Sequence, residues 1–232
     1  MHAPRRVVAN IRAVQLRPPR TMIRVVVNRT EPEPALLDRA AGAIRQGGLV
    51  ALPTDTLYGL AADPFNAAAV RRVFLVKGRT LARALPLVAA DLSQINAQLG
   101  PLPPIAVALA KQFWPGPLTM LVPASGELAA DVTGGTGRVG VRVPAHAVAR
   151  GLCRACRSVL TATSANLSGQ PASKDPDDVA RSLGSELDIL LDAGTAPGGP
   201  SSTIVDVTGD ELRLVRAGAI PWEEVRRCAH RA

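Results

Sequence analysis

The sequence predicts a single-domain α/β fold with a mixed sheet and flanking helices. From Met22 onward, short apolar runs alternate with segments whose apolar residues recur at helical spacing, which is the pattern of α/β proteins. The later apolar runs follow one another across short turns, which favours antiparallel pairing beside parallel strands. The 232 residues suffice for one domain with a buried core, and no repeat or linker divides them.

The predicted helices begin and end at recognisable signals. An apolar stripe over residues 36–44 stops at Gly47-Gly48, and a second stripe over residues 69–74 stops near Gly78. Asp91 is placed to cap a short helix, and Asp175-Pro176 combines a cap with a proline at the first helical position. Two further helices are expected at residues 103–113 and after Pro221.

The predicted strands are short apolar runs rich in branched residues. Residues 49–52 are apolar without interruption, which is typical of a strand buried on both faces. The other predicted strands lie at residues 23–27, 86–90, 118–122, 139–143, 159–162, 189–191, 203–207 and 212–215.

Composition excludes several classes of protein. With 47% hydrophobic and 20% charged residues, the chain has the profile of a soluble globular protein. No run approaches the roughly 18 apolar residues that a membrane helix needs, so we expect no membrane contact. Aromatic residues make up 3% of the chain, which argues against a stacking platform for single-stranded nucleic acid.

Most of the net charge of +8 lies in the N-terminal segment. Residues 1–21 hold five arginines and no acid, so the remainder has 22 basic and 19 acidic residues, and 22 minus 19 gives +3. We therefore predict a basic N-terminal extension over residues 1–22, either disordered or a mis-assigned start, followed by one domain over residues 23–232.

Three cysteines, an odd number, favour a reducing compartment over a disulfide framework, and we expect a cytoplasmic protein. Cys153 and Cys156 could form a zinc site with Cys228 and His230, but the second pair has poor spacing for such a site. We interpret the first pair as part of a surface turn, and we predict no metal held by protein side chains.

Several segments place hydroxyl groups at strand ends, where α/β proteins commonly bind ligands. Residues 53–56 read Pro-Thr-Asp-Thr, residues 163–169 read Thr-Ser-Ala-Asn-Leu-Ser-Gly, and residues 201–203 read Ser-Ser-Thr. Each segment alone is also compatible with an ordinary turn, because Ser, Thr, Asn, Asp and Gly favour turns.

Cations accompany these segments. Lys77-Gly78-Arg79 suits phosphate oxygens, although cations are also common at a helix C-terminus. Arg142 lies within a β-branched run, where it either faces outward or awaits an anion, and Arg216 has the same ambiguity. The chain contains only His2, His146 and His230, none in the hydroxyl-rich segments, which argues against a Ser-His-Asp hydrolase or a metal hydrolase.

Two nucleotide-binding motifs are excluded. Residues 135–140 match G-x-G-x-x-G, but the glycines lead into a predicted strand, whereas the dinucleotide fingerprint opens a helix. No G-x-x-x-x-G-K-[ST] occurs. Cations and hydroxyls converging on a polyanion would instead support phosphoryl or nucleotidyl transfer by positioning and electrostatics.

Six segments in a fixed order resemble the YrdC family, the threonylcarbamoyl-AMP synthases. They are Pro-Thr-Asp-Thr-Leu-Tyr-Gly-Leu (53–60), Lys-Gly-Arg (77–79), Pro-Gly-Pro-Leu-Thr (115–119), Val-Gly-Val-Arg-Val-Pro (139–144), Thr-Ser-Ala-Asn-Leu-Ser-Gly (163–169) and Ser-Thr-Ile-Val-Asp (202–206). The resemblance implies a twisted α/β sheet with a deep, positively lined concavity. It also implies synthesis of L-threonylcarbamoyladenylate from L-threonine, bicarbonate and ATP, with Mg²⁺ and with release of pyrophosphate.

The resemblance further implies site residues and partners. Lys77 and Arg79 would be catalytic, and Thr56, Arg142 and Ser202 would bind threonine. The residues implied to bind ATP are Lys77, Arg79, Arg138, Ser164, Asn166 and Arg216. Downstream proteins would transfer the threonylcarbamoyl group to the adenosine beside the anticodon of certain tRNAs. The alternative is a double-stranded RNA or tRNA-binding module without synthase activity, although a charge of about +3 is modest for a shape reader of RNA.

Overall fold

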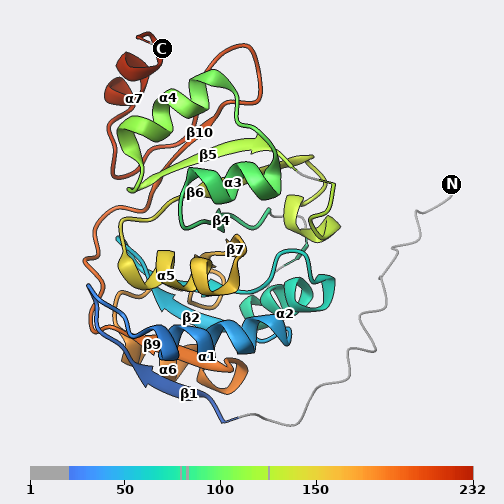
Figure 1. Ribbon diagram of the computed structural model, residues 1–232, viewed down its shortest axis with the longest axis vertical. Coiled ribbons are helices and arrows are strands. Elements are labelled where there is room, and N and C mark those ends of the chain that lie inside the picture. The colour runs from blue at the N-terminus through green and yellow to red at the C-terminus, as the bar shows by residue number, and fades with distance from the viewer. Residues whose placement is uncertain (1–20, 79, 82–83, 125, 232) are drawn as a thin grey trace, which may run out of the picture.

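The computed structural model describes residues 21–78, 80–81, 84–124 and 126–231, which form a mixed α/β fold (Figure 1). The strands are divided between two mixed sheets, with the order β1-β9-β2-β3-β8 in the first and β11-β10-β5-β6-β4-β7 in the second. The mixed α/β class predicted from the sequence is therefore confirmed, but two sheets take the place of one. Arg79 and residues 1–20 of the predicted extension lie outside the described residues.

The first sheet occupies the lower half of the molecule in Figure 1. Its strands are β1 (Ile23–Val26), β9 (Ile189–Asp192), β2 (Val50–Pro53), β3 (Tyr58–Ala61) and β8 (Thr163–Ser164). β1, β9 and β2 run parallel, whereas β2–β3 and β3–β8 pair antiparallel. Leu49 and Ala51 enter one hydrophobic core while Val50 and Leu52 enter another, so β2 is buried on both faces as its apolar run predicts.

The second sheet occupies the upper half of Figure 1. Its strands are β4 (Leu87–Val88), β5 (Leu118–Pro123), β6 (Arg138–Arg142), β7 (Leu160–Thr161), β10 (Thr203–Asp206) and β11 (Arg213–Arg216). β5 pairs parallel with β10 and antiparallel with β6, and β6 pairs parallel with β4. The glycines of residues 134–137 lead into β6 and not into a helix, which agrees with the rejection of a dinucleotide motif.

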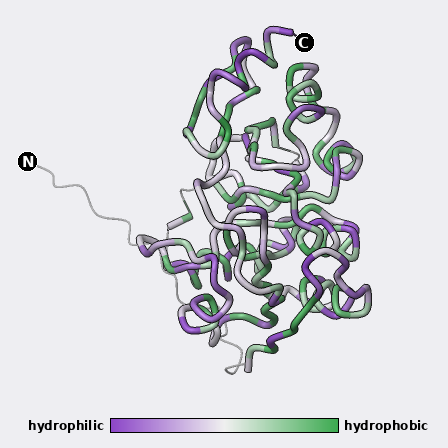
Figure 2. The backbone as a smooth tube through the Cα atoms, turned by 90° about the vertical axis from the view of Figure 1, so that its left-hand side faces the viewer, coloured by the Kyte–Doolittle hydropathy of each residue, from purple (hydrophilic) through white to green (hydrophobic). Residues whose placement is uncertain are grey.

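Helices cover the sheets with their apolar faces. They are α1 (Pro34–Arg45), α2 (Ala67–Lys77), α3 (Leu92–Leu99), α4 (Pro104–Phe113), α5 (Ala147–Cys156), α6 (Pro176–Leu183) and α7 (Trp222–Ala229), with 3₁₀ turns at Ala130–Thr133 and Gly184–Glu186. α1 and α5 pack together against the first sheet, and α4 packs against α7. Figure 2 shows hydrophilic and hydrophobic stretches alternating along the helical coils, as expected for half-buried helices. No described helix is long and apolar enough to cross a membrane.

Local signals explain where several helices begin. Asn66 accepts hydrogen bonds from the backbone N–H groups of Ala68 and Ala69, which starts α2. The predicted cap Asp91 accepts from the N–H of Gln94, and Asp175 accepts from that of Asp177. Gly78 adopts φ 61° at the end of α2, a left-handed conformation that favours glycine.

The structure corrects one interpretation of the sequence and confirms another. Cys153 is fully buried on α5, so the Cys-x-x-Cys pair is not a surface turn. The strand predicted at residues 159–162 is confirmed as β7 in the second sheet, and the two-residue strand β8 that follows it belongs to the first sheet. The chain therefore crosses between the sheets at Ala162.

Thr161 joins the two sheets at this crossing. Its Oγ1 accepts a hydrogen bond of 2.8 Å from the backbone N–H of Ala62, and its own N–H donates to the Ala62 carbonyl at 3.0 Å. Because Thr161 is completely buried, loss of its hydroxyl would leave the Ala62 N–H without an acceptor.

Replacement Thr161→Val is therefore expected to lower the free energy of unfolding by about 1–3 kcal/mol, since it keeps the shape but removes the acceptor. Chemical denaturation followed by circular dichroism measures this change. The matched control is Thr195→Val, at an exposed position, with an expected change within about 0.5 kcal/mol. Equal stability of the two variants would contradict the bridging role.

Candidate functional site

A cavity of about 480 Å³ lies where the two sheets meet. The first sheet contributes the turn between β2 and β3 together with β8, and the second contributes β4, β5, β6 and the chain entering β10. Seven serine and threonine residues line it: Thr54, Thr56, Thr119, Thr163, Ser164, Ser201 and Ser202. Among the described lining residues only Arg142 and Arg216 are charged. The cavity is therefore rich in hydroxyls and positively charged.

The β2–β3 turn is held in shape by Thr54. Its Oγ1 donates to the carbonyl of Leu57 at 2.7 Å and accepts from the N–H groups of Thr56 and Leu57 at 3.2 and 3.3 Å. Thr56 lines the cavity, and its Oγ1 lies 3.2 Å from that of Thr54. The Pro-Thr-Asp-Thr segment thus forms a rigid turn that presents hydroxyls to the cavity.

The floor of the cavity is one face of the second sheet. Thr119 and Leu121 on β5, and Gly140 and Arg142 on β6, are alternate residues on adjacent antiparallel strands, so their side chains share a face. A Cβ at Gly140 would lie 3.1 Å from Cγ2 of Thr119, tighter than an ordinary contact. Glycine at this position therefore keeps the floor open.

Ser202 and Arg216 form the wall next to β10. Ser202 Oγ lies 2.8 Å from Thr119 Oγ1, and Arg216 donates from Nη2 to the Ser202 carbonyl at 2.7 Å and to its Oγ at 3.2 Å. The chain after β11 approaches Ser201 closely, and this approach requires glycine at position 218, because a Cβ there would lie 2.3 Å from the Ser201 carbonyl oxygen. Partial burial lowers the pKa of the Arg216 guanidinium.

Lys77 supports the loop that follows β8. Its ammonium is buried and donates to the carbonyls of Ser164 and Asn166 at 2.5 and 2.8 Å and to Asn166 Oδ1 at 3.3 Å. Nδ2 of Asn166 donates hydrogen bonds within the same loop, to the carbonyls of Leu167 and Gln170. Of these three residues only Ser164 lines the cavity. Lys77 and Asn166 therefore lie behind the wall and shape it.

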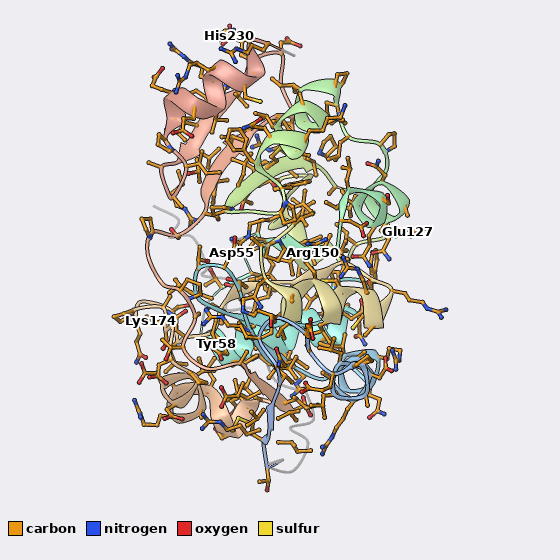
Figure 3. All side chains as sticks on the ribbon, turned by 60° about the vertical axis from the view of Figure 1, so that its left-hand side comes forward. Asp55, Tyr58, Glu127, Arg150, Lys174 and His230 are labelled. Carbon is orange, nitrogen blue, oxygen red and sulfur yellow. The ribbon has the colours of Figure 1, made fainter. Side chains whose placement is uncertain are left out.

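Arg142 is buried at the end of β6, where its Nη1 lies 3.2 Å from Oδ1 of Asp55. Burial lowers the pKa of the Arg142 guanidinium, the negative charge of Asp55 opposes that shift, and Arg216 adds to it. Figure 3 shows Asp55 between the two sheets and far from His230 at the end of α7. The ion pair thus connects the β2–β3 turn of one sheet to β6 of the other.

His146 lies beside this pair and immediately precedes α5. The residue is 6% exposed, and neither ring nitrogen has a hydrogen-bond partner in the described structure. Burial lowers the pKa of the His146 imidazole from 6.5 to about 4, Arg29 lowers it further and Asp55 opposes the shift. The imidazole is therefore neutral at pH 7.

The structure brings together Thr56, Arg142, Ser164, Ser202 and Arg216 around one cavity. Arg138 lies at the other end of β6, where it forms an ion pair with Asp206, and it shares the strand face of Gly140 and Arg142 by alternation. Lys77 and Asn166 lie behind the loop, whereas Arg79 lies outside the described residues.

Sequence reasoning assigned no role to Asp55 or Thr119. Asp55 lies within the Pro-Thr-Asp-Thr segment, but nothing local indicates that it faces Arg142, 87 positions further along the chain. Thr119 ends the Pro-Gly-Pro-Leu-Thr segment (115–119). A hydroxyl at the start of the strand that follows Pro-Gly-Pro was the signal that could have indicated a site residue.

The donor set of the cavity bears on metal binding. The described residues contain no group of three or more His, Cys, Asp or Glu that could hold a metal ion. Cys153 and Cys156 lie on α5, whereas Cys228 lies on α7, which packs against α4 in the other half of the molecule. A second hollow of about 370 Å³ beside α1 and β9 offers Arg39 and Asp188 but no comparable set of hydroxyls.

The buried Arg142 and the exposed Arg216, placed among hydroxyls at the junction of two mixed sheets, define a binding site for an anionic small molecule. Comparison with known proteins gives the family. The model of the Sua5/yciO/yrdC family, described as "Telomere recombination", matches residues 42–218. The chain belongs to this family.

Individual relatives agree with this assignment. The chain is 39% identical over 188 residues to a threonylcarbamoyl-AMP synthase of Pyrococcus abyssi. The aligned region covers 81% of this chain and 55% of that protein. The chain is also 39% identical over 175 residues to a threonylcarbamoyl-AMP synthase of Nitrosococcus oceani, with 75% and 95% covered. The chain thus spans about half the length of the Pyrococcus relative and nearly all of the Nitrosococcus one.

A solved structure matches the fold. The crystal structure of Pyrococcus abyssi Sua5 complexed with L-threonine superposes with a TM-score of 0.83 at 37% sequence identity, covering 88% of this chain and 60% of that one. The two-sheet architecture is therefore shared with a protein that binds L-threonine.

The buried imidazole predicts a pH dependence of stability. Between pH 6.5 and about 4 the unfolded chain binds a proton at His146 that the native state does not, so protons favour unfolding in this window. As the pH falls through this window, the free energy of unfolding should decrease in the native chain and in His146→Gln. We expect the decrease to be larger in the native chain, by on the order of 2 kcal/mol. Denaturation at pH 7, 5.5 and 4.5 measures the difference. The control is His230→Gln, an exposed position, and parallel curves for all three proteins would contradict the prediction.

Proposed function

We propose that the protein is a threonylcarbamoyl-AMP synthase, which makes L-threonylcarbamoyladenylate and pyrophosphate from L-threonine, bicarbonate and ATP. The observation that carries the proposal is the convergence of Arg142, Arg216 and seven hydroxyl residues on one cavity. Membership of the family and the synthases of Pyrococcus and Nitrosococcus support the same reaction.

The amino acid would lie at the buried end of the cavity. Arg142 offers a guanidinium fork suited to the carboxylate of threonine, and burial strengthens that contact because water does not screen it. The hydroxyls of Thr56 and Ser202 lie on the facing walls and can bond the polar groups of the substrate. An arginine within a β-branched strand is thereby explained as the partner of an anion.

The nucleotide would lie across the floor toward Arg216 and Arg138. Ser164 presents a hydroxyl to the phosphates from a loop whose shape Lys77 and Asn166 maintain. Lys77 then acts on ATP mainly through that loop, since its ammonium already has three acceptors in the described structure. Arg79, next to Gly78 at the end of α2, is proposed to contact the phosphates directly.

The chemistry needs charge stabilisation more than a strong base. The amine nitrogen of threonine bonds to the carbon of bicarbonate, water leaves, and the product is a carbamate anion. A carbamate oxygen then bonds to the α-phosphorus while the bond to the bridging oxygen breaks and pyrophosphate leaves. Both partners are anions, so Arg142, Arg216 and Arg79 offset their repulsion. No histidine is among the described residues that line the cavity, which suits a mechanism without a strong base.

We also propose that Mg²⁺ accompanies ATP. The described lining residues offer hydroxyls but no carboxylate, which fits a cation held mainly by phosphate oxygens and water. Such an ion supplies further neutralisation of the phosphate charge. Ser164 is the hydroxyl best placed to contact its hydration shell.

The product is a mixed anhydride that water hydrolyses, so transfer proteins acting on tRNA would take it up directly in the cytoplasm. A tRNA or double-stranded RNA contact remains part of the proposal for that handover. No observation favours an RNA-binding module without synthase activity, and the relatives described above are named as synthases.

The proposal predicts threonine-dependent release of pyrophosphate from ATP and bicarbonate in the absence of RNA. A coupled pyrophosphate assay measures it. In Arg142→Gln the KM for threonine should rise about tenfold to hundredfold, because one charged contact to the carboxylate is lost. The matched control Arg226→Gln, exposed on α7, should leave KM unchanged. Absence of pyrophosphate release from the native protein would refute the synthase assignment.

Lys77→Ala should abolish pyrophosphate release and also lower the melting temperature by several degrees, because three buried acceptors lose their donor. The control Lys111→Ala removes an exposed lysine of α4 and should change neither quantity. Full activity in Lys77→Ala would contradict the role of Lys77 in shaping the Ser164–Asn166 loop.

A further inference from the structure

Arg142, which lines the cavity, belongs to a buried group of charged and titratable side chains. The group consists of Asp55 in the β2–β3 turn, Arg142 at the end of β6 and His146 before α5. The side chains of Arg142 and Asp55 are 10% and 11% exposed. Arg142 lines the cavity, whereas Asp55 and His146 do not. Asp55 is therefore a largely buried carboxylate outside the described lining, paired with an arginine that lines the cavity.

The polar atoms of this group are incompletely satisfied. Both carboxylate oxygens of Asp55 and the Nη1 of Arg142 are buried without a hydrogen-bond partner in the described structure. Nη1 of Arg142 lies 3.2 Å from Oδ1 of Asp55, so the two side chains form an ion pair, although the contact lacks hydrogen-bond geometry. Burying a carboxylate costs several kcal/mol in general, so a buried acid needs a compensating role. Here the partner that can supply this compensation is the guanidinium of Arg142.

Asp55 is itself held rigidly. Thr54, which precedes Asp55, closes the turn with three hydrogen bonds of 2.7, 3.2 and 3.3 Å to Leu57 and Thr56, which follow it. Pro53 immediately precedes the turn and pairs with Tyr58 across the hairpin. The position of the carboxylate is thus fixed by the first sheet, while the guanidinium that it faces is carried by the second.

The charge of Asp55 favours the protonated form of Arg142 at this place. Arg142 and Arg216 both line the cavity, and each carries a positive charge that the other repels. Asp55 is the one acid whose charge favours the protonated form of Arg142 among the influences acting on that residue.

We propose that Asp55 is a positioning residue that fixes the Arg142 guanidinium, so that its remaining N–H groups face the carboxylate of the amino-acid substrate. This proposal rests on the function proposed above. Carboxylate binding by arginine depends on the orientation of a planar fork, and a fork free to rotate loses affinity. Asp55 therefore governs affinity for threonine without touching it.

Asp55→Asn tests this role because it keeps the volume and removes the charge. The KM for threonine should rise about tenfold or more, while the KM for ATP and kcat at saturating threonine change less than about threefold. The matched control Asp192→Asn removes another carboxylate paired with an arginine, Arg24, on β9 outside the cavity lining. It should leave the KM for threonine unchanged.

A double-variant cycle separates positioning from a direct contact. If Asp55 acts through Arg142, adding Asp55→Asn to Arg142→Gln raises the KM for threonine no further than Arg142→Gln alone. Additive effects in the double variant, or a native KM for threonine in Asp55→Asn, would overturn the proposal. Failure of the synthase assignment is recognised separately, from the native protein releasing no pyrophosphate.

Asp55→Glu covers the case in which the asparagine variant does not fold. It retains the charge that compensates Arg142 but displaces the carboxylate by one methylene. Calorimetric titration with L-threonine should then show affinity weakened at least about fivefold, with folding intact by circular dichroism. Native affinity in Asp55→Glu would show that the place of the carboxylate does not matter and would also overturn the proposal.

Discussion

The crossing of the chain from one sheet to the other at Ala162 is the constraint on which the cavity depends. Leu160 and Thr161 pair within the second sheet, and two residues later Thr163 and Ser164 pair within the first. So short a connection leaves the sheets no freedom to separate at this point. The hydroxyl of Thr161 fastens the junction, and the residues that follow it immediately line the cavity.

Charge, and not a reactive side chain, gives the cavity its character. Arg142 and Arg216 reach it, and Asp55, the acid paired with Arg142, lies outside the described lining. Such an arrangement attracts anions while each cation keeps a fixed position. The proposed reaction joins two anions, so it demands positioned charge more than a strong base.

The sequence predicted those parts of the structure that depend on local signals. The apolar run of β2, the caps Asp91 and Asp175 and the glycine after α2 are all determined within a few residues, and they occur as expected. The β3 strand was missed because it is short, is buried on both faces without alternation and directly follows a polar turn. The division into two sheets depends on pairing between distant strands.

The candidate site likewise has a part that the sequence predicts and a part that depends on contacts between distant residues. Thr56, Arg142, Ser164, Ser202 and Arg216 meet in one cavity because the motifs that contain them end strands at one junction. The orientation of Lys77 could not be predicted, since its acceptors are backbone carbonyls 87 and 89 residues away. Asp55 was overlooked for the same reason, because its partner lies on the other sheet.

The burial of Lys77 has a practical consequence for handling the protein. The chain contains three lysines, of which Lys111 and Lys174 are exposed and Lys77 is buried on carbonyl oxygens. Amine-directed dyes and cross-linkers therefore attach to the side chains of Lys111 and Lys174 and spare the third. The folded protein can thus be labelled or tethered to a surface without disturbing the loop that carries Ser164.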